Sequence, residues 1–197
     1  MNRFSIFKKS DKSRWSYTDI LYVIAVSCIL IFVFERYILK IEHEILEMFL
    51  MSTLLIVWFL GGIVLKFFRL FKPDPLKGKL EGFLTFEMDK IIVGKESFSL
   101  DEIKTIWLTN DDYYGKSNHS GSFGSNLSNG VNNSCKITLI NGREVVCNYE
   151  LYNSNDLQKI KPELVHYYKS GKLDFEHLSY LLGIGNKEIE AFNRSID

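Results

Sequence analysis

Cysteine and proline are scarce in this chain of 197 residues, which contains three of each. Cys28, Cys135 and Cys147 show no CxxC spacing, and the four histidines form no HxxxH pair. A structural zinc site and a disulfide framework are therefore not expected, and a reducing compartment fits better. Pro73 and Pro75 lie almost side by side, where they predict a linker after a helix.

The motifs of common catalytic and nucleotide sites are also missing. The chain has no GxxxxGK[ST] phosphate loop, no GxGxxG, no HExxH and no GxSxG. Asp111 and Asp112 are neighbouring carboxylates, but such a pair at the end of a strand is more typical of a solvated turn than of catalysis. We therefore expect neither an enzyme nor a metal or cofactor site.

A positive surface for nucleic acid is lacking too. Residues 175–192, "FEHLSYLLGIGNKEIEAF", have the spacing of a helix-turn-helix. The second helix, however, sets Lys187 and Arg194 against Glu188 and Glu190, and residues 76–197 carry 14 Lys and Arg against 17 Asp and Glu. Because DNA binding requires a positive face, we expect no nucleic-acid partner and interpret these helices as packing elements.

What the chain does contain is two long apolar runs. Residues 20–34 are uncharged over fifteen positions and residues 48–65 over eighteen. These lengths predict a membrane α-hairpin within residues 19–70, with helices at about 19–39 and 47–69 and a short external loop. A pair of buried core helices is disfavoured, because the chain is too short to surround them. Gly61 and Gly62 permit a close helix–helix contact, and with it a possible homo-oligomer.

Basic residues flank the two runs and predict their orientation. Five Lys and Arg precede the first run and another five follow the second, whereas the connecting loop is mostly acidic. The positive-inside rule places both termini in the cytoplasm. We therefore expect a multi-pass protein of the bacterial inner membrane, with residues 1–18 as a cytoplasmic segment and residues 71–79 as a linker. Lys72, Lys77 and Lys79 are candidates for contact with the membrane surface of the lipid bilayer.

Residues 80–170 change to the alternating pattern of short strands. The clearest hairpin is "CKITLINGREVVCNYEL", for which a three-residue loop at 140–142 keeps the apolar faces consistent. This register sets Ile137 opposite Val145 and Cys135 opposite Cys147. We favour two adjacent free thiols there over a redox pair.

A polar stretch at residues 117–134, "SNHSGSFGSNLSNGVNNS", is either a ligand-cradling loop or a connection between strands. We favour the structural role. Asn129 and Gly130 are expected to form a tight turn, and Asn132 or Asn133 to hydrogen-bond neighbouring backbone. Loop interaction with a ligand is the alternative for these four residues.

The end of the chain has the periodicity of helices. A helix that ends near residue 170 is expected to cap the strands, and residues 171–197 to form a helical pair. The predicted apolar stripe faces the core and consists of Leu157, Ile160, Leu164, Tyr167, Tyr168, Phe175, Leu178, Leu181, Leu182, Ile189, Phe192 and Ile196.

The order of strands and several short segments resemble the pleckstrin-homology-like domains of bacterial membrane proteins. The segments are "GFLTFEMDKIIV", "FSLDEIKTI", "NDDYYG" and "SNGVNNSCKITLING", and the match runs from about Gly78 to Gly171. The whole chain resembles proteins of this type, with a two-helix membrane hairpin, from bacteria of the Bacteroidetes group. The resemblance implies a bent antiparallel barrel capped by C-terminal helices, in an α+β cytoplasmic domain, and no catalytic residues.

The predicted function is that of a non-catalytic integral membrane protein that presents this interaction module to a protein partner. The alternative is a two-span sensor–effector, whose barrel binds a small ligand, for example a nucleotide, and whose spans perturb the membrane. Few Arg and Lys converge on the predicted barrel, which favours the first function.

Overall fold

A computed structural model describes residues 3–10, 17–38, 44–70, 73, 75–117, 127–185 and 187–196. The chain divides into two compact units. The first combines residues 1–11, 76–117 and 128–197, and the second combines residues 12–75 and 118–127. The first unit is called the β unit below, because it contains the sheet.

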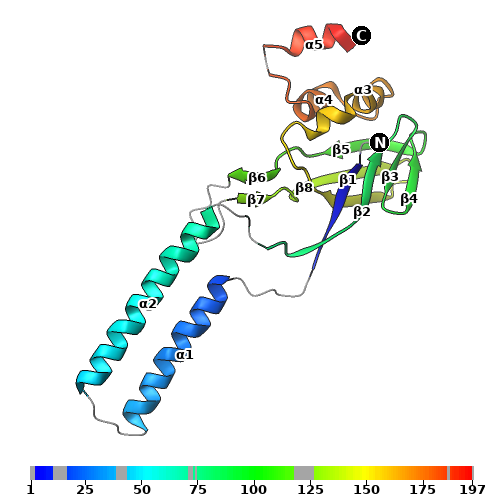
Figure 1. Cartoon of the computed structure of the whole chain (residues 1–197). Helices are drawn as coiled ribbons and strands as arrows, with labels where there is room; N and C mark the ends of the chain where they lie inside the picture. Colours follow the sequence, from blue (N-terminus) through cyan, green and yellow to red (C-terminus); the bar gives the residue numbers. More distant parts are fainter. Residues whose placement is uncertain are drawn as a thin grey trace. The chain divides into compact units, whose positions relative to one another are not determined.

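Seven antiparallel strands form the main sheet of the β unit, in the order β4-β3-β2-β1-β9-β8-β5 (Figure 1). Strands β6 and β7 form a separate two-stranded sheet. The strands are β1 (Arg3–Lys9), β2 (Gly78–Phe86), β3 (Lys90–Val93), β4 (Glu96–Ser99), β5 (Ile103–Leu108), β6 (Tyr114–Ser117), β7 (Leu127–Asn129), β8 (Asn133–Leu139) and β9 (Glu144–Tyr149).

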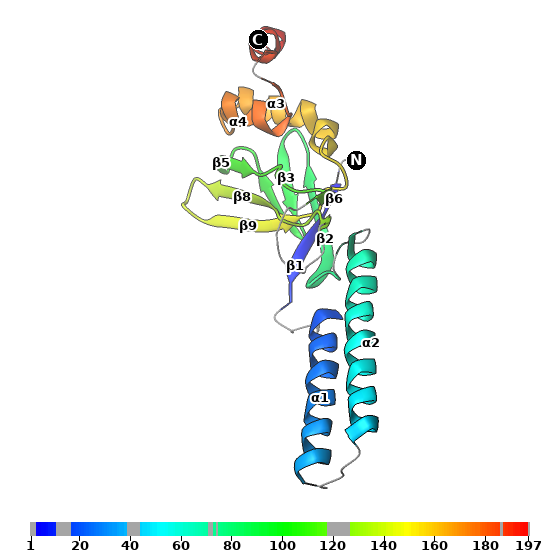
Figure 2. The ribbon, with the colours of Figure 1, turned by 90° about the vertical axis from the view of Figure 1, so that its left-hand side faces the viewer.

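The main sheet is strongly bent, because its two outermost strands are consecutive in the chain. Only residues 100–102 connect the end of β4 to the start of β5. The four Cα–Cα steps from Ser99 to Ile103 reach about 15 Å. In a flat sheet these strands would be six spacings apart, or roughly 29 Å. The sheet therefore curls around a core, and Figure 2 shows the bend between its β2–β3 and β8–β9 parts.

Strand β1 is an element that the sequence analysis placed in a segment before the first apolar run. It lies in the middle of the sheet, between β2 and β9. Phe4 and Ile6 are buried, whereas Arg3 is exposed, so this short strand alternates between core and solvent. The strand pairs with β2 although residues 12–75 of the second unit separate the two in the chain. "RFSIFKK" carries this period-two signal, but it contributes only two apolar residues to the core.

The β8–β9 hairpin has the predicted register. Ile137 pairs with Val145, and Cys135 pairs with Cys147. The Leu139 N–H donates to the Arg143 carbonyl at 2.8 Å, which leaves residues 140–142 as a three-residue loop. Gly142 has a φ of 85°, the conformation that a bulge after a tight turn requires. The observed register confirms the prediction, and this loop length keeps Ile137 and Cys135 in the core.

Helical elements at the end of the chain lie over the sheet, and the last of them packs on the outer side of the others (Figures 1 and 2). Asp174 caps one of them, since its carboxylate accepts the His177 N–H at 2.6 Å. The elements are η1 (Asp156–Ile160), α3 (Lys161–Lys169), α4 (Phe175–Leu181) and α5 (Ile189–Ile196). Nine members of the predicted stripe are buried, which confirms its direction: Leu157, Ile160, Leu164, Tyr167, Leu178, Leu181, Leu182, Phe192 and Ile196.

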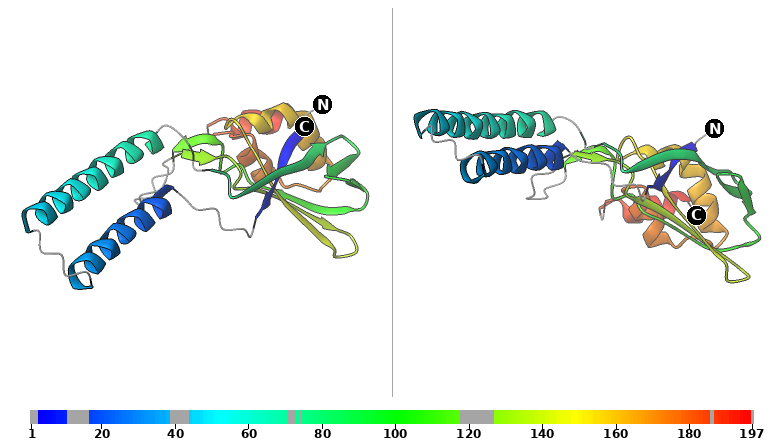
Figure 3. Two further views of the ribbon diagram at one scale, coloured as in Figure 1. Left: turned by 60° about the horizontal axis from the view of Figure 1, so that its bottom comes forward. Right: turned by 90° about the horizontal axis from the view of Figure 1, so that it is seen from below.

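The second unit contains helices α1 (Tyr17–Tyr37) and α2 (Glu44–Leu70), which lie side by side in each view (Figures 1 and 3). Most of their described apolar side chains are exposed. Leu30 of α1 is 62% exposed and Phe59 of α2 is 64% exposed. Exposed apolar surface of this extent marks a contact surface of some kind.

Neither helix supports the prediction of membrane spans. Among the described residues, no helix is both long enough and apolar enough to cross a membrane. The uncharged run of α1 ends at Glu35 after fifteen residues. This run is shorter than the roughly 20 residues that a span requires.

The predictions that depended on these spans are therefore wrong. One is the function as an integral membrane protein, either as an interaction module or as a sensor–effector. The other is the multi-pass location in a bacterial inner membrane with both termini cytoplasmic. The predicted fold class is wrong as well. The described residues form an α+β fold of five α-helices and a seven-stranded antiparallel sheet, whose strand order has two ends, β4 and β5.

Candidate functional site

A large open site of the β unit lies where strands β1 and β9 separate. These strands pair at only two positions, Ile6 with Tyr149 and Phe7 with Asn148. Beyond that point β1 stays with β2 as far as Lys9, while β9 stays with β8. The resulting β1–β9 cleft has a volume of about 770 Å³. Its lining residues are Ile6, Phe7, Lys8, Lys9, Glu81, Gly82, Val93, Gly94, Lys95, Glu96, Val145, Val146, Cys147 and Asn148.

Backbone groups of β9 face this cleft. In an antiparallel ladder, successive residues turn their N–H and C=O groups alternately to one neighbouring strand and to the other. Leu139 and Arg143 are bonded across the hairpin, so Val145 and Cys147 also bond toward β8. Glu150 donates its N–H to the Ser5 carbonyl of β1 at 3.0 Å. The N–H and C=O of Val146 therefore point into the cleft, where no strand of the described residues pairs with them.

Charge around the cleft is uneven once the ion pairs are taken into account. Lys8 lies 3.5 Å from Glu81, and Arg143 lies 2.7 Å from Glu96. Lys9 and Lys95 have no ion-pair partner among the described residues. Both are exposed, so the rim of the cleft has an excess of positive charge.

The wall of the cleft is apolar and contains a thiol. Val93, Val145 and Cys147 are partly buried and pack against the core. Cys147 lies opposite the buried Cys135, and both thiols are free. A hydrogen bond from Cys135 lowers the pKa of Cys147, and the same bond, together with burial, raises the pKa of Cys135. The more accessible partner is therefore the more easily ionised of the two.

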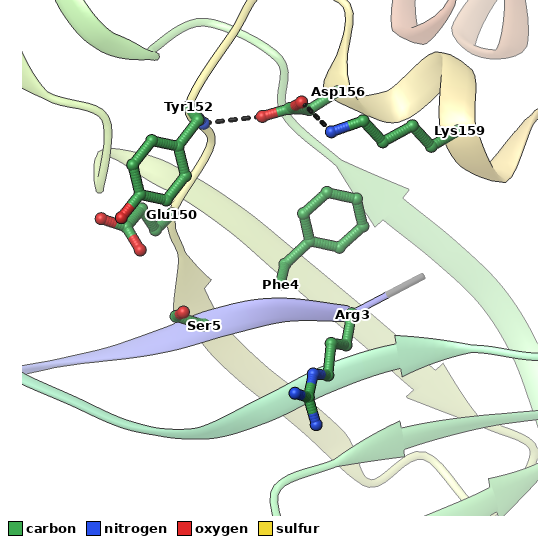
Figure 4. A pocket seen from close by; sticks show the side chains of 7 residues that line it. All are labelled: Arg3, Phe4, Ser5, Glu150, Tyr152, Asp156 and Lys159. Carbon is green, nitrogen blue, oxygen red and sulfur yellow. Dashed lines mark hydrogen bonds and ion pairs between the residues drawn. The ribbon is translucent and has the colours of Figure 1, made fainter. Parts of the chain in front are cut away.

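A second, smaller pocket of about 380 Å³ lies between the start of β1 and the segment that follows β9 (Figure 4). It is lined by Arg3, Phe4, Ser5, Glu150, Tyr152, Asp156 and Lys159. Figure 4 shows Asp156 and Lys159 directed toward one another, with a distance of 2.6 Å between the carboxylate and the ammonium nitrogen. The Arg3 guanidinium stacks 4.4 Å from the centre of the Phe83 ring instead of entering the pocket.

The carboxylates of this second pocket are engaged within the chain. Asp156 also accepts the N–H of Tyr152 at 2.7 Å and that of Asn153 at 2.9 Å. Burial opposes ionisation of Asp156, but its bonds to Lys159 and to the two N–H groups outweigh burial and lower its pKa. Burial raises the pKa of Glu150, and a hydrogen bond to Ser5 partly offsets this. The pocket is consequently a structural clamp and a weaker candidate for ligand binding.

The polar turn predicted at residues 129–133 has a structural geometry. Gly130 has a φ of 72°, and a Cβ placed on it would lie 2.3 Å from the Leu151 carbonyl oxygen. The fully buried Asn133 side chain accepts the N–H groups of Asp111 and Asp112 at 3.1 and 3.0 Å. It also donates to the carbonyls of Asp112 and Gly130 at 2.8 and 3.1 Å.

The other polar residues of this turn also form hydrogen bonds within the chain. Asn132 donates its N–H to the buried carboxylate of Asp112 at 3.0 Å, and Ser128 donates its hydroxyl to the same oxygen at 2.7 Å. Asn129 ends β7. Asp111 accepts the Tyr180 hydroxyl at 2.7 Å. Residues 118–126 of the polar stretch lie outside the described residues.

The remaining predicted site residues are not brought to the cleft rim. Gly61 and Gly62 lie in α2, and a Cβ added to either would meet no described neighbour within 4 Å. Lys77 and Lys79 are exposed at the start of β2, whereas Lys72 lies outside the described residues. Contact of these lysines with a lipid surface stays a prediction. The sequence analysis missed the cleft because its two sides, residues 6–9 and 144–148, are far apart in the chain.

Within the described part of the chain, no group of three or more His, Cys, Asp or Glu is placed to hold a metal ion. No family model, no curated protein and no solved structure matches the chain. The resemblance to pleckstrin-homology-like domains therefore stays a prediction. The cleft and its chemistry are the basis for a proposal about function.

Proposed function

We propose that the β unit is a non-catalytic binding module that accepts an extended segment of a protein partner in the β1–β9 cleft. The observation that carries this proposal is the short contact between β1 and β9, which is limited to two residue pairs. Beyond it, Val146 offers an N–H and a C=O to the cleft. A partner strand in this position would bond to β9 as an added strand, a common mode of peptide recognition.

The chemistry of the cleft favours a particular kind of segment. Lys9 and Lys95 on the rim attract acidic side chains, because the two glutamates of the rim are already paired with Lys8 and Arg143. The apolar wall at Val93 and Val145 suits alternate apolar side chains, which an extended strand presents on one face. The proposed ligand is therefore a strand that alternates apolar and acidic residues.

The carboxylates near the sheet form hydrogen bonds within the chain, which supports binding without catalysis. Asp112 and Asp156 are buried and hold loop backbone, and Asp111 holds the Tyr180 hydroxyl. Each of these carboxylates has a bond that holds a loop or a neighbouring side chain in position. Their contacts are those of turns and clamps.

Peptide binding to the full chain tests the proposal. The probes are fluorescent peptides that alternate valine with glutamate, and matched peptides that alternate valine with lysine. Fluorescence anisotropy is expected to show saturable binding of the first set only. Val146→Pro removes the N–H that faces the cleft and should weaken binding about fivefold, the equivalent of one hydrogen bond of about 1 kcal/mol.

The matched control is Val146→Ala, which shortens an exposed side chain but keeps the N–H. It is expected to bind like the parent chain. Lys95→Glu should weaken binding of the acidic peptide, whereas Lys104→Glu on β5, outside the cleft, should not. Equal binding by the proline and alanine variants, or a preference for the lysine peptide, would reject the strand-addition proposal.

A further inference from the structure

Cys135 and Cys147 occupy directly opposite positions on β8 and β9. Opposite residues of an antiparallel pair have Cα atoms about 4.5–5.5 Å apart. Disulfides join Cα atoms that are about 4.4–6.8 Å apart. The backbone therefore needs no rearrangement to bring the two sulfur atoms within bonding reach, and the two thiols are close enough to shift each other's pKa.

The two thiols differ in access. Cys135 is 1% exposed and belongs to the core. Cys147 is half-buried and lines the β1–β9 cleft, whose volume of about 770 Å³ admits a small reagent. A reagent that enters the cleft meets Cys147, whereas Cys135 does not line the cleft and is buried. This gives the pair an attacking thiol at the cleft and a second thiol behind it.

We propose that Cys147 and Cys135 are a reversible thiol–disulfide pair, which a small-molecule disulfide oxidises through the β1–β9 cleft. The Cys147 thiolate attacks one sulfur of the reagent, forms a mixed disulfide and releases the other half as a thiolate. Cys135 then loses its proton and attacks the Cys147 sulfur, which releases the second half as a thiol. Two protein thiols are oxidised, and one small-molecule disulfide is reduced to two thiols.

The electrostatics of the pair suit the order of these steps. Its hydrogen bond with Cys135 lowers the pKa of Cys147, so the accessible sulfur is the one that reaches the reactive thiolate state more readily. Burial adds to the effect of that bond in raising the pKa of Cys135. The second thiol therefore stays protonated until a mixed disulfide forms beside it. The inference rests on this pair alone and is independent of any peptide in the cleft.

Intact-mass measurement of the full chain tests the proposal, with oxidised glutathione as the probe. Cys28→Ser is introduced first, so that only Cys135 and Cys147 remain. The parent is expected to lose two hydrogen atoms and to retain no glutathione. With Cys135→Ser, the reaction should stop at a mixed disulfide on Cys147. With Cys147→Ser, the chain should remain almost unmodified over the same time.

Two results would overturn the proposal. One is a mixed disulfide that persists in the parent with both cysteines present. The other is modification of the Cys147→Ser chain as fast as that of the parent. Thermal unfolding of each variant provides the control for folding, and dithiothreitol should restore the original mass of the oxidised parent. The reaction is measured without peptide, so its outcome is separate from that of the proposed function: the thiol reaction is expected whether or not the valine–glutamate peptide binds the cleft.

Discussion

The Asn133 side chain donates a hydrogen bond to the carbonyl of Gly130 at 3.1 Å while the same side chain accepts the N–H of Asp112 at 3.0 Å. One buried amide thus joins the turn after β7 to the segment that leads into β6. The Leu151 N–H donates a second hydrogen bond to the same Gly130 carbonyl, at 2.9 Å. This point connects three segments of the β unit that are distant in sequence.

Asn133→Ala is expected to destabilise the β unit by about 3 kcal/mol, because it leaves several buried backbone groups without a partner. Urea unfolding followed by circular dichroism measures this. Asn132→Ala is the matched control, since Asn132 is exposed and contributes its backbone N–H, which alanine retains. A similar loss of stability in both variants would show that the buried amide has no special role.

The carboxylate of Asp156 predicts a pH dependence of stability. Its pKa is lower in the folded chain than in the unfolded chain, because bonds from Lys159 and two N–H groups outweigh the effect of burial. A group with a lowered folded pKa stabilises the fold above its unfolded pKa, and this contribution is lost as the pH falls through the folded pKa. Asp156→Asn should therefore be less stable than the parent at neutral pH.

The measurement for Asp156 is the midpoint of urea unfolding of parent and variant between neutral and strongly acidic pH. The difference in the free energy of unfolding between parent and variant is expected to be on the order of 1 kcal/mol at neutral pH and to decrease as the pH falls. Lys159 is largely exposed, so solvent weakens its share of the effect. A difference in the free energy of unfolding that stays constant with pH would show that ionisation of Asp156 does not cause it.

The exposed apolar side chains of α1 and α2 predict self-association of the second unit. Gly61 and Gly62 leave space on α2 for the close approach of a helix from a second copy. Gly62→Leu should fill that space and reduce the fraction of dimer in sedimentation experiments. Ile56→Leu is the control, because 3.6 residues per turn place Ile56 on the opposite side of the helix and the change preserves volume.

Chemical cross-linking of the full chain supplies a second readout for self-association. A chain that remains monomeric at all concentrations, and that binds phospholipid vesicles instead, would show that lipid and not a second copy covers these helices. Equal effects of Gly62→Leu and Ile56→Leu would place the contact elsewhere.

Local patterns predicted several elements of the β unit correctly. The β8–β9 register followed from the requirement that Ile137 and Cys135 face the core together, and the stripe from Leu157 to Ile196 followed from helical periodicity. In both cases the decisive neighbours lie within a few residues in the sequence. Patterns of this kind specify which face of an element is buried.

Other features depended on distant residues. β1 was missed because the two residues of "RFSIFKK" that enter the core, Phe4 and Ile6, are a weak signal until β2 and β9 lie on either side. The apolar runs indicated membrane spans, but among the described residues no helix is both long enough and apolar enough to cross a membrane. The first half of β2 alternates like a buried strand, yet Leu80 is 44% exposed, and only the last three residues of the strand are buried.

Local sequence was sufficient to specify the hairpin register, the capping stripe and the polar turn at Asn133, since each depends on the period of a strand or helix and on nearby hydrogen-bonding groups. The position of β1, the separation of β1 from β9 and the approach of Lys9 and Lys95 to one cleft emerged only with the tertiary structure. These depend on how a bent sheet brings residues 3–9 beside residues 144–149. No local pattern encodes that approach, because the free energy that drives it comes from burial of the core as a whole.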